Sequence, residues 1–359
     1  MSRINFSLQM NINEVANTIM AIGHEITPVI ISEPGVGKSS ILKMLEEKYG
    51  DEYDYIYVDC PVKDMMDIAA SIPNHQTRSL EYYVSSLFKL DSGKPKVIML
   101  DEFMKAPKLL QIIFTRLMLE RSVGDKPLPV SETGKKSIVF GTSNNATDGV
   151  GDSMLAHAGN RVCKIQMSKP NADQWCAWAT ANGIARPIRA WVTMTPKVMN
   201  SYLDPNQEDN EYIFKPSSHG QFASPRSLAK ASIIVEQRDV IGENALAVAL
   251  AGTIGEAAAK SMAAFIALED RLTLTKDILK DAKNMKVPDD VSALVMMMFE
   301  AVDYLDNQDD LNKYMEFVNR IKQSEIQSIF FTMMMRTKPR IARYNAAITK
   351  WATDNHMLM

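Results

Sequence analysis

Residues 32–39 read Ser32-Glu33-Pro34-Gly35-Val36-Gly37-Lys38-Ser39, and they follow the apolar run of residues 26–31. They match the phosphate-binding pattern G-x-x-x-x-G-K-[ST] everywhere except at its first position, where Ser32 replaces glycine. The apolar run predicts a buried parallel strand, and the residues after Ser39 predict the first turns of a helix. The two glycines let the loop turn its N–H groups toward an anion at the positive end of that helix. The stretch therefore predicts a phosphate-binding loop.

This loop predicts particular contacts with a bound nucleotide. We expect Lys38 to reach the β- and γ-phosphates and the Ser39 hydroxyl to bind Mg²⁺. The backbone angle at Ser32 is an open question, because the pattern has a conformationally free glycine at that position. The residues predicted to bind the nucleotide are Glu33, Pro34, Gly35, Val36, Gly37, Lys38, Ser39 and Ser40.

A second apolar run, residues 97–100, ends in Asp101 and Glu102. It predicts a buried parallel strand with two carboxylates at its carboxyl end, where α/β sheets bind ligands. We expect Asp101 to hold Mg²⁺ through its water shell, and Glu102 to polarise the attacking water. Alone, this pattern also fits an ordinary strand end. After a phosphate-binding loop, it predicts Mg²⁺-dependent hydrolysis of ATP.

Further strands and helices follow from the hydrophobic pattern. Residues 7–22 and 106–121 predict helices, residues 53–59, 137–144 and 161–167 predict strands, and residues 122–136 predict a hairpin or an extended loop. After Pro170 the pattern is helical. Ser224 and Pro225 predict the cap and the first turn of one helix. We interpret the methionine clusters at 296–298 and 333–335 as core or helix-contact filling rather than as a binding groove.

The bulk composition excludes several classes of protein. A net charge of −3 over 359 residues gives no global positive field for nucleic acid. The cysteines Cys60, Cys163 and Cys176 are too few and too scattered for a disulfide framework or a metal site, which favours a reducing compartment. The chain opens without a signal-peptide pattern, and Glu256 and Lys260 interrupt its longest apolar stretch. We expect a soluble cytoplasmic protein.

Together these motifs resemble the MoxR-like AAA+ ATPases (ATPases associated with diverse cellular activities), in the variety found in bacteria and their phages. The resemblance covers the predicted ATPase core well and the last part of the chain poorly. It rests on residues 33–39, on residues 100–107 with Asp-Glu before a Lys-Ala-Pro turn, and on four shorter matches: Glu120-Arg121, Thr142-Ser143-Asn144, Asn160-Arg161-Val162 and Ala223-Ser224-Pro225-Arg226. Residues 251–258 add a weaker similarity.

The resemblance implies roles for further residues. Asn144 would position the lytic water or the γ-phosphate, and Arg226 would reach ATP from a lid in the same subunit. Arg161 would act in trans as an arginine finger, which requires a ring, and the family forms hexamers. Alternatives stay open at each arginine. Arg161 also fits a structural residue at a strand start, Arg226 fits a helix surface, and Arg121 fits either the finger or a packing and salt-bridge residue at the subunit boundary.

The resemblance also implies the domain organisation. The fold class is α/β, a P-loop AAA+ core with a parallel sheet flanked by helices over residues 1–168. An all-α lid carrying the second sensor follows over residues 169–262, and a helical C-terminal extension occupies residues 263–359. The insertion between Met65 and Lys94 resembles the helix-2 insert of the family, which faces the ring's pore. Tyr82 and Tyr83 are therefore either pore contacts or ordinary core tyrosines.

Three functions compete at this point. The leading one is an ATP-driven ring that remodels a protein partner, which in many relatives is a von Willebrand factor A domain protein encoded alongside. The second is a nucleic-acid motor such as a helicase, loader or translocase, which the acidity and the missing DNA-binding module disfavour. ATPase stimulation by DNA would identify it. The third is a scaffold that binds ATP with little turnover, and the set Lys38, Asp101, Glu102 and Asn144 argues against it.

Overall fold

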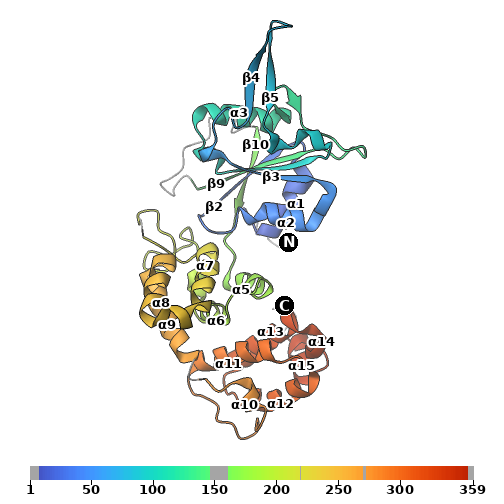
Figure 1. The fold of residues 1–359 in the computed structure, drawn as a ribbon. Coiled ribbons are helices and arrows are strands. Elements are labelled where there is room, and N and C mark those ends of the chain that lie inside the picture. The colour runs from blue at the N-terminus through green and yellow to red at the C-terminus, as the bar shows by residue number, and fades with distance from the viewer. Residues whose placement is uncertain (1–7, 146–160, 219, 270–271, 355–359) are drawn as a thin grey trace, which may run out of the picture. The chain divides into compact units, whose positions relative to one another are not determined.

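The computed structural model describes residues 8–145, 161–218, 220–269 and 272–354. These residues fall into two compact units. One unit comprises residues 1–170 and 214–219, and the other comprises residues 171–213 and 220–359. The first is built on a sheet and the second is helical (Figure 1).

A six-stranded parallel sheet forms the centre of the first unit. Its order is β1-β10-β2-β9-β6-β3, so β9 lies between the strand that precedes the loop and the strand that ends in Asp101. The carboxyl ends of β2, β9 and β6 are therefore neighbours. This confirms the α/β fold class. The strands are β1 Gln9–Met10, β2 Thr27–Ser32, β3 Asp54–Asp59, β6 Lys96–Asp101, β9 Ile138–Asn144 and β10 Val162–Met167.

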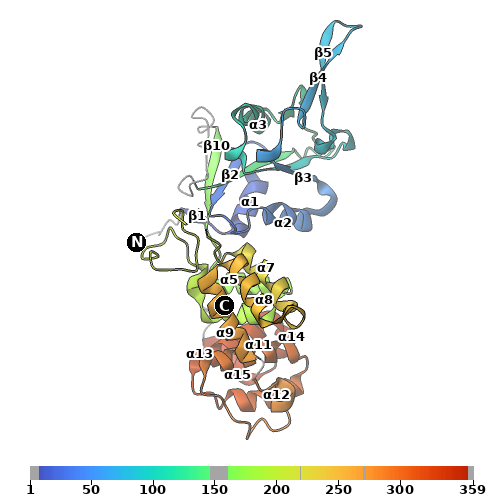
Figure 2. The same cartoon turned by 60° about the vertical axis from the view of Figure 1, so that its left-hand side comes forward.

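Helices cover both faces of this sheet (Figure 2). On one face, α1 (Ile12–Ile22) and α2 (Ser40–Tyr49) pack on residues such as Ile30 and Met99. On the other face, α3 (Lys108–Glu120) packs on their strand neighbours Val29 and Ile98. Successive strand residues point to opposite faces, and both are apolar here, which is the pattern of a strand buried on both sides.

The helix predicted over residues 7–22 begins later than expected. Residues 9–10 pair with β10 as an edge strand, and Leu8 is exposed instead of lying on an apolar helix face. Asn11 then caps α1, because its side chain accepts hydrogen bonds from the backbone N–H groups of Asn13 and Glu14. The local capping signal and the strand pairing outweigh the helical period at this end.

Two small antiparallel hairpins extend from the first unit. The first joins β4 (Ala69–Asn74) and β5 (Ser79–Val84) within the insertion, and it projects from the sheet (Figure 1). The second joins β7 (Ser122–Val123) and β8 (Lys126–Pro127), in the segment predicted to be a hairpin or an extended loop.

The regular elements of the second unit are all helices within its described residues, as predicted. Ser224 caps α7, with Pro225 in the first turn, which confirms that predicted helix start. Met296, Met297 and Met298 are buried in the core of this unit, and so is Met334, which confirms their interpretation as core filling. The helices are α5 Ala172–Ala181, α6 Arg186–Met194, α7 Pro225–Glu236, α8 Arg238–Ile254, α9 Glu256–Glu269, α10 Thr275–Ile278, α11 Val291–Tyr304, α12 Gln308–Val318, α13 Ser324–Thr337, α14 Pro339–Ala342 and α15 Ala346–Asp354.

In the part of the chain that the structure describes, no helix combines the length and the apolar character needed to cross a membrane.

Candidate functional site

The loop between β2 and α2 has the backbone of a phosphate cradle. Gly35 and Gly37 have φ angles of 78° and 108°, in the region that favours glycine. Ser32, by contrast, is the last residue of β2 and pairs with Asn144 of β9. A strand conformation suits any side chain, so the serine at the first position of the pattern needs no glycine. This answers the question that the sequence left open.

Lys38 lies inside this loop, with only 6% of its surface exposed. Its Nζ donates to the Ser32 carbonyl and hydroxyl oxygens, both at 3.1 Å, and to the Glu33 carbonyl oxygen at 2.9 Å. It also donates to Asn144 Oδ1 at 2.8 Å. The loop lysine and the polar residue at the end of β9 therefore meet directly, although 106 positions separate them in the sequence.

Asp101, at the end of β6, is buried and held by three hydroxyl groups. Tyr57 OH donates to Oδ2 at 2.7 Å, and Ser39 Oγ donates to the same oxygen at 3.3 Å. Thr142 Oγ1 donates to Oδ1. Burial raises the pKa of Tyr57, and its hydrogen bond to Asp101 raises it further, so the phenol stays protonated as the donor. Ser39 makes no capping bond to α2 with its side chain, which is turned toward Asp101 instead.

Glu102 follows in a left-handed backbone conformation, with φ at 51° and ψ at 37°. Its backbone N–H donates to Thr142 Oγ1 at 3.2 Å, and its carboxylate pairs with Lys105 at 2.7 Å. About a third of the Glu102 side chain is exposed, at 35%. Positive φ is uncommon for a residue with a side chain and occurs often at functional sites.

No group of three or more His, Cys, Asp or Glu side chains within the described ranges could hold a metal ion by itself. A site with one carboxylate and one hydroxyl suits Mg²⁺, which keeps several waters and usually shares its ligands with substrate phosphates. Ser39 and Asp101 therefore fit such an ion bound together with a nucleotide. The glycine backbone, the buried Lys38 and the start of α2 fit the nucleotide's phosphates.

Arg161 lies at the other end of the sheet's strands, where β2 and β10 begin; we call this the amino edge. It is exposed and directly precedes β10, whose first residue Val162 pairs with Thr27 at the start of β2. A strand rises about 3.3 Å per residue, so roughly 17 Å of β2 separates this edge from Ser32. Arg161 is thus far from the loop of its own chain.

Arg121 is also near the amino end of β2, but its guanidinium is bound within the chain. Nη1 donates to Thr27 Oγ1 and Nη2 to the Gly23 carbonyl oxygen, both at 2.8 Å. Burial lowers the pKa of Arg121 to about 10. These contacts tie the end of α3 to the start of β2, and they support the packing alternative for this residue.

Arg226 lies in the helical unit, exposed in the first turn of α7. The loop belongs to the other unit. Its role as a second sensor stays a prediction. Of the predicted site residues, the structure brings together Lys38, Ser39, Asp101 and Asn144, with Glu102 adjacent through Thr142.

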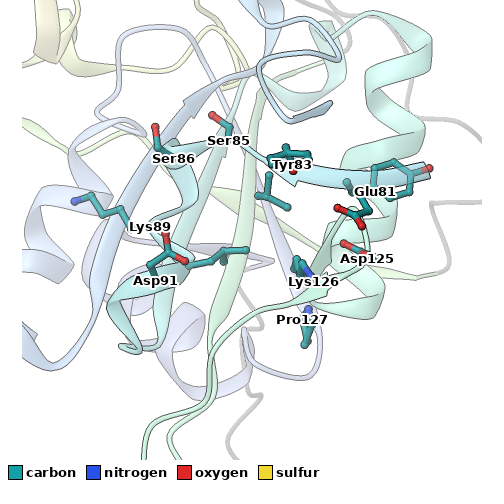
Figure 3. A pocket seen from close by; sticks show the side chains of 12 residues that line it. Glu81, Tyr83, Ser85, Ser86, Lys89, Asp91, Asp125, Lys126 and Pro127 are labelled. Atoms are coloured by element: carbon teal, nitrogen blue, oxygen red, sulfur yellow. The ribbon is translucent and has the colours of Figure 1, made fainter. Parts of the chain in front are cut away.

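Tyr82 and Tyr83 belong to β5, and both are exposed, so the alternative of ordinary core tyrosines is wrong. They lie beside an open cavity of about 590 Å³ between β5 and the turn that leads into β8 (Figure 3). Charged residues of both signs line it, including Glu81, Lys89 and Asp125. The cavity is separate in sequence from the loop and carries none of the predicted site residues apart from the two tyrosines.

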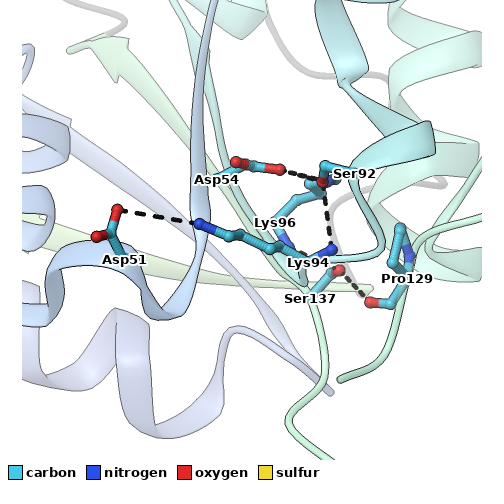
Figure 4. A network of polar contacts seen from close by, with 7 residues as sticks. All are labelled: Asp51, Asp54, Ser92, Lys94, Lys96, Pro129 and Ser137. Carbon is cyan, nitrogen blue, oxygen red and sulfur yellow. Dashed lines mark hydrogen bonds and ion pairs between the residues drawn. The ribbon is translucent and has the colours of Figure 1, made fainter. Parts of the chain in front are cut away.

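A second buried lysine, Lys96, begins β6 at the amino edge of the sheet. Its Nζ contacts Asp54 Oδ2 at 2.6 Å and Ser92 Oγ at 2.5 Å, and Ser92 also donates to Asp54 (Figure 4). Its backbone N–H donates to Ser137 Oγ at 2.9 Å. Sequence reasoning missed the Lys96–Asp54 pair, and it also missed the hydrogen bonds of Tyr57 and Thr142 to Asp101. The two carboxylates at the end of β6 predicted a site at that position, but only the strand register identifies which hydroxyl groups reach Asp101.

No protein-family model matches the chain, and a comparison with curated proteins finds no match. Two solved structures that it resembles are a Cytophaga hutchinsonii protein classed as a candidate ATPase and a mutant of Thermotoga maritima RuvB. The first is 13% identical with a TM-score of 0.34, and the match covers 88% of this chain and 79% of that one. The second is 10% identical with a TM-score of 0.35, covering 77% of this chain and 79% of the other. These likenesses are too distant to carry a functional argument.

Proposed function

We propose that the chain is an AAA+ ATPase that binds ATP with Mg²⁺ at the carboxyl edge of its sheet and hydrolyses it. One observation carries the proposal: the loop lysine Lys38, the hydrogen-bonded pair Ser39 and Asp101, and Asn144 meet at this edge, around a loop with two left-handed glycines. A purely structural role does not explain why these residue types converge on one strand-loop-helix unit.

The residues divide the work as follows. Residues Glu33 to Ser40 would bind the phosphates through their backbone N–H groups, with Lys38 on the β- and γ-phosphates. Ser39 and Asp101 would hold Mg²⁺, which neutralises charge on the phosphates when bound. Glu102 would accept a hydrogen bond from the attacking water, and its present partner Lys105 would have to release it for that contact. Asn144 would orient the same water or the γ-phosphate.

The proposal extends to a ring of subunits. Arg161 is exposed at the edge opposite the loop, so it can contact a nucleotide only if that nucleotide is bound to another chain. An arginine supplied in trans accelerates phosphoryl transfer by several orders of magnitude. We propose a hexamer of the MoxR-like type, with Arg226 contributing from the lid and a protein as the remodelled partner. A von Willebrand factor A domain protein is the first candidate for that partner.

The proposal is tested by phosphate release from Mg–ATP with the full chain and with Glu102→Gln. We expect the wild type to turn over ATP, and Glu102→Gln to bind ATP with at least about a hundredfold slower release, since a positioned base contributes roughly 10²–10⁴-fold. Glu120→Gln is the matched control, because Glu120 pairs with Arg116 on the surface of α3, away from the loop. Equal turnover in Glu102→Gln and wild type would contradict the assignment of Glu102.

A further inference from the structure

The hydroxyl of Thr142 occupies a particular place in the network at the carboxyl edge. Thr142 lies in β9 and is fully buried. Its Oγ1 donates to Asp101 Oδ1 and accepts from the backbone N–H of Glu102 at 3.2 Å. A hydroxyl has one proton to donate and lone pairs to accept with, so both bonds form at once. One side-chain atom therefore contacts two consecutive residues of the strand end.

The other two hydroxyl groups around Asp101 both bond to its other carboxylate oxygen. Tyr57 and Ser39 both donate to Oδ2 of Asp101. The two oxygens of Asp101 are thus held from different sides, Oδ1 from β9 and Oδ2 from β3 and the loop. Thr142 Oγ1 contacts both Asp101 and the residue that follows it.

Glu102 needs such a link because of its backbone. Its φ of 51° is uncommon for a residue with a side chain, and conformations of this kind persist only where the surroundings fix them. The bond from its N–H to Thr142 Oγ1 is one such restraint, and it sets the direction in which the Glu102 side chain leaves the backbone.

We infer that Thr142 is a positioning residue that fixes Asp101 and Glu102 relative to one another, so that the metal-binding carboxylate and the water-polarising carboxylate keep one geometry. The inference rests on the proposed function. Phosphoryl transfer depends mostly on the placement of the reacting groups and on charge stabilisation. Loss of the two Thr142 hydrogen bonds should therefore lower turnover more than nucleotide binding.

The test is Thr142→Val, which keeps the shape of the side chain and removes the hydroxyl. We expect kcat for Mg–ATP to fall roughly 10- to 100-fold, the cost of a small misplacement of catalytic groups, with KM and the equilibrium affinity for ATP nearly unchanged. Thr142→Ser, which restores a hydroxyl, should recover most of kcat. Thr142→Ala carries the same test if Thr142→Val fails to fold, as checked by circular dichroism.

Two control variants separate this role from simpler ones. Tyr57→Phe removes one hydrogen bond to Asp101 without touching Glu102, and it should lower kcat less than Thr142→Val. Thr115→Val removes a buried hydroxyl that bonds the Gln111 carbonyl oxygen within α3, and it should leave kcat unchanged.

The outcomes separate this inference from the proposed function. Wild-type turnover in Thr142→Val, or a loss no greater than in Tyr57→Phe, overturns the positioning role and leaves the ATPase proposal standing. A wild-type chain that neither binds nor hydrolyses ATP overturns the proposed function and this inference with it.

Discussion

Two buried lysines lie at opposite edges of the same sheet, and their surroundings differ. Lys96, at the amino edge, is fully buried and pairs with the Asp54 carboxylate, which Ser92 also contacts. Lys38, at the carboxyl edge, is 6% exposed, and four carbonyl, hydroxyl and amide oxygens of the loop and of Asn144 contact it.

The difference indicates which edge is built for a ligand. A carboxylate in contact with a buried ammonium compensates its charge and holds it in place. Bonds to neutral oxygens are weaker than charge-assisted bonds to phosphate, so phosphate oxygens can replace them. We therefore propose that the amino edge stabilises the fold and that the carboxyl edge binds the nucleotide. The predictions below test this division.

The largest expected effect is that of Lys38→Ala on activity. Loss of the lysine should lower ATP turnover by about a thousandfold or more, because it would remove the proposed charge-assisted contact to the transferred phosphate as well as ground-state binding. The fold should survive, since the substitution removes a buried charge held by loop oxygens. Phosphate release and far-ultraviolet circular dichroism measure the two outcomes. Unfolding of Lys38→Ala would make this lysine structural, like Lys96.

Arg161→Ala tests whether Arg161, at the amino edge, contacts a nucleotide bound to a neighbouring chain. We expect this variant to lose turnover by a factor of about 10³, as for an arginine finger, while it still binds ATP. Mixing it with Lys38→Ala should restore part of the activity, because each variant supplies what the other lacks. Wild-type specific activity should also rise with protein concentration. Flat activity on dilution, with no effect of Arg161→Ala, would leave the ATPase and remove the ring.

Lys96→Met should destabilise the sheet unit without abolishing nucleotide binding. Removing one partner of a buried ion pair leaves Asp54 uncompensated, which costs about 3–5 kcal/mol. Exchanging both partners, Lys96→Met with Asp54→Leu, should recover much of that loss.

Hydrogen exchange of peptides from β3 and β6 measures the stability of this unit. Tryptophan fluorescence is an internal control, because all four tryptophans lie in the helical unit. A double variant as unstable as Lys96→Met would show that the pair contributes more than charge compensation.

The smallest effect concerns pH. Burial alone would raise the pKa of Asp54, but its hydrogen bonds with Lys96 and Ser92 outweigh burial and lower the pKa below the usual 3.8. As the pH falls, Asp54 is protonated at a higher pH in the unfolded chain than in the folded chain. Its contribution to stability is therefore present above about pH 4 and is lost below it. Asp54→Asn should therefore flatten the acid limb of the stability profile. An unchanged acid limb would contradict this contribution.

The sequence predicted the parts of the site that are local. The loop, its strand and helix, the Asp101-Glu102 strand end and the strand ending in Asn144 depend on short motifs and on hydrophobic runs, which are read within a few residues. The packing of the methionine clusters and the cap at Ser224 were also predictable for this reason.

The contacts that were missed depend on register. Thr142 meets Asp101 across 41 positions, and Lys96 meets Asp54 across 42, because β9, β6 and β3 pair side by side. No local pattern encodes such a pairing. The β4–β5 hairpin was missed for another reason: its residues are largely exposed, and Pro73 interrupts β4. Proline is tolerated there because a two-stranded hairpin consists of edge strands.

The most direct test of the account is calorimetric titration of a non-hydrolysable ATP analogue into the wild-type chain and into Lys38→Ala, with Mg²⁺ and with the ion removed by chelation. The account predicts Mg²⁺-dependent binding to the wild type at one site per chain, and its loss in Lys38→Ala. The absence of binding to the wild type, or equal binding to both proteins, would contradict the claim that the carboxyl edge of this sheet is a nucleotide site.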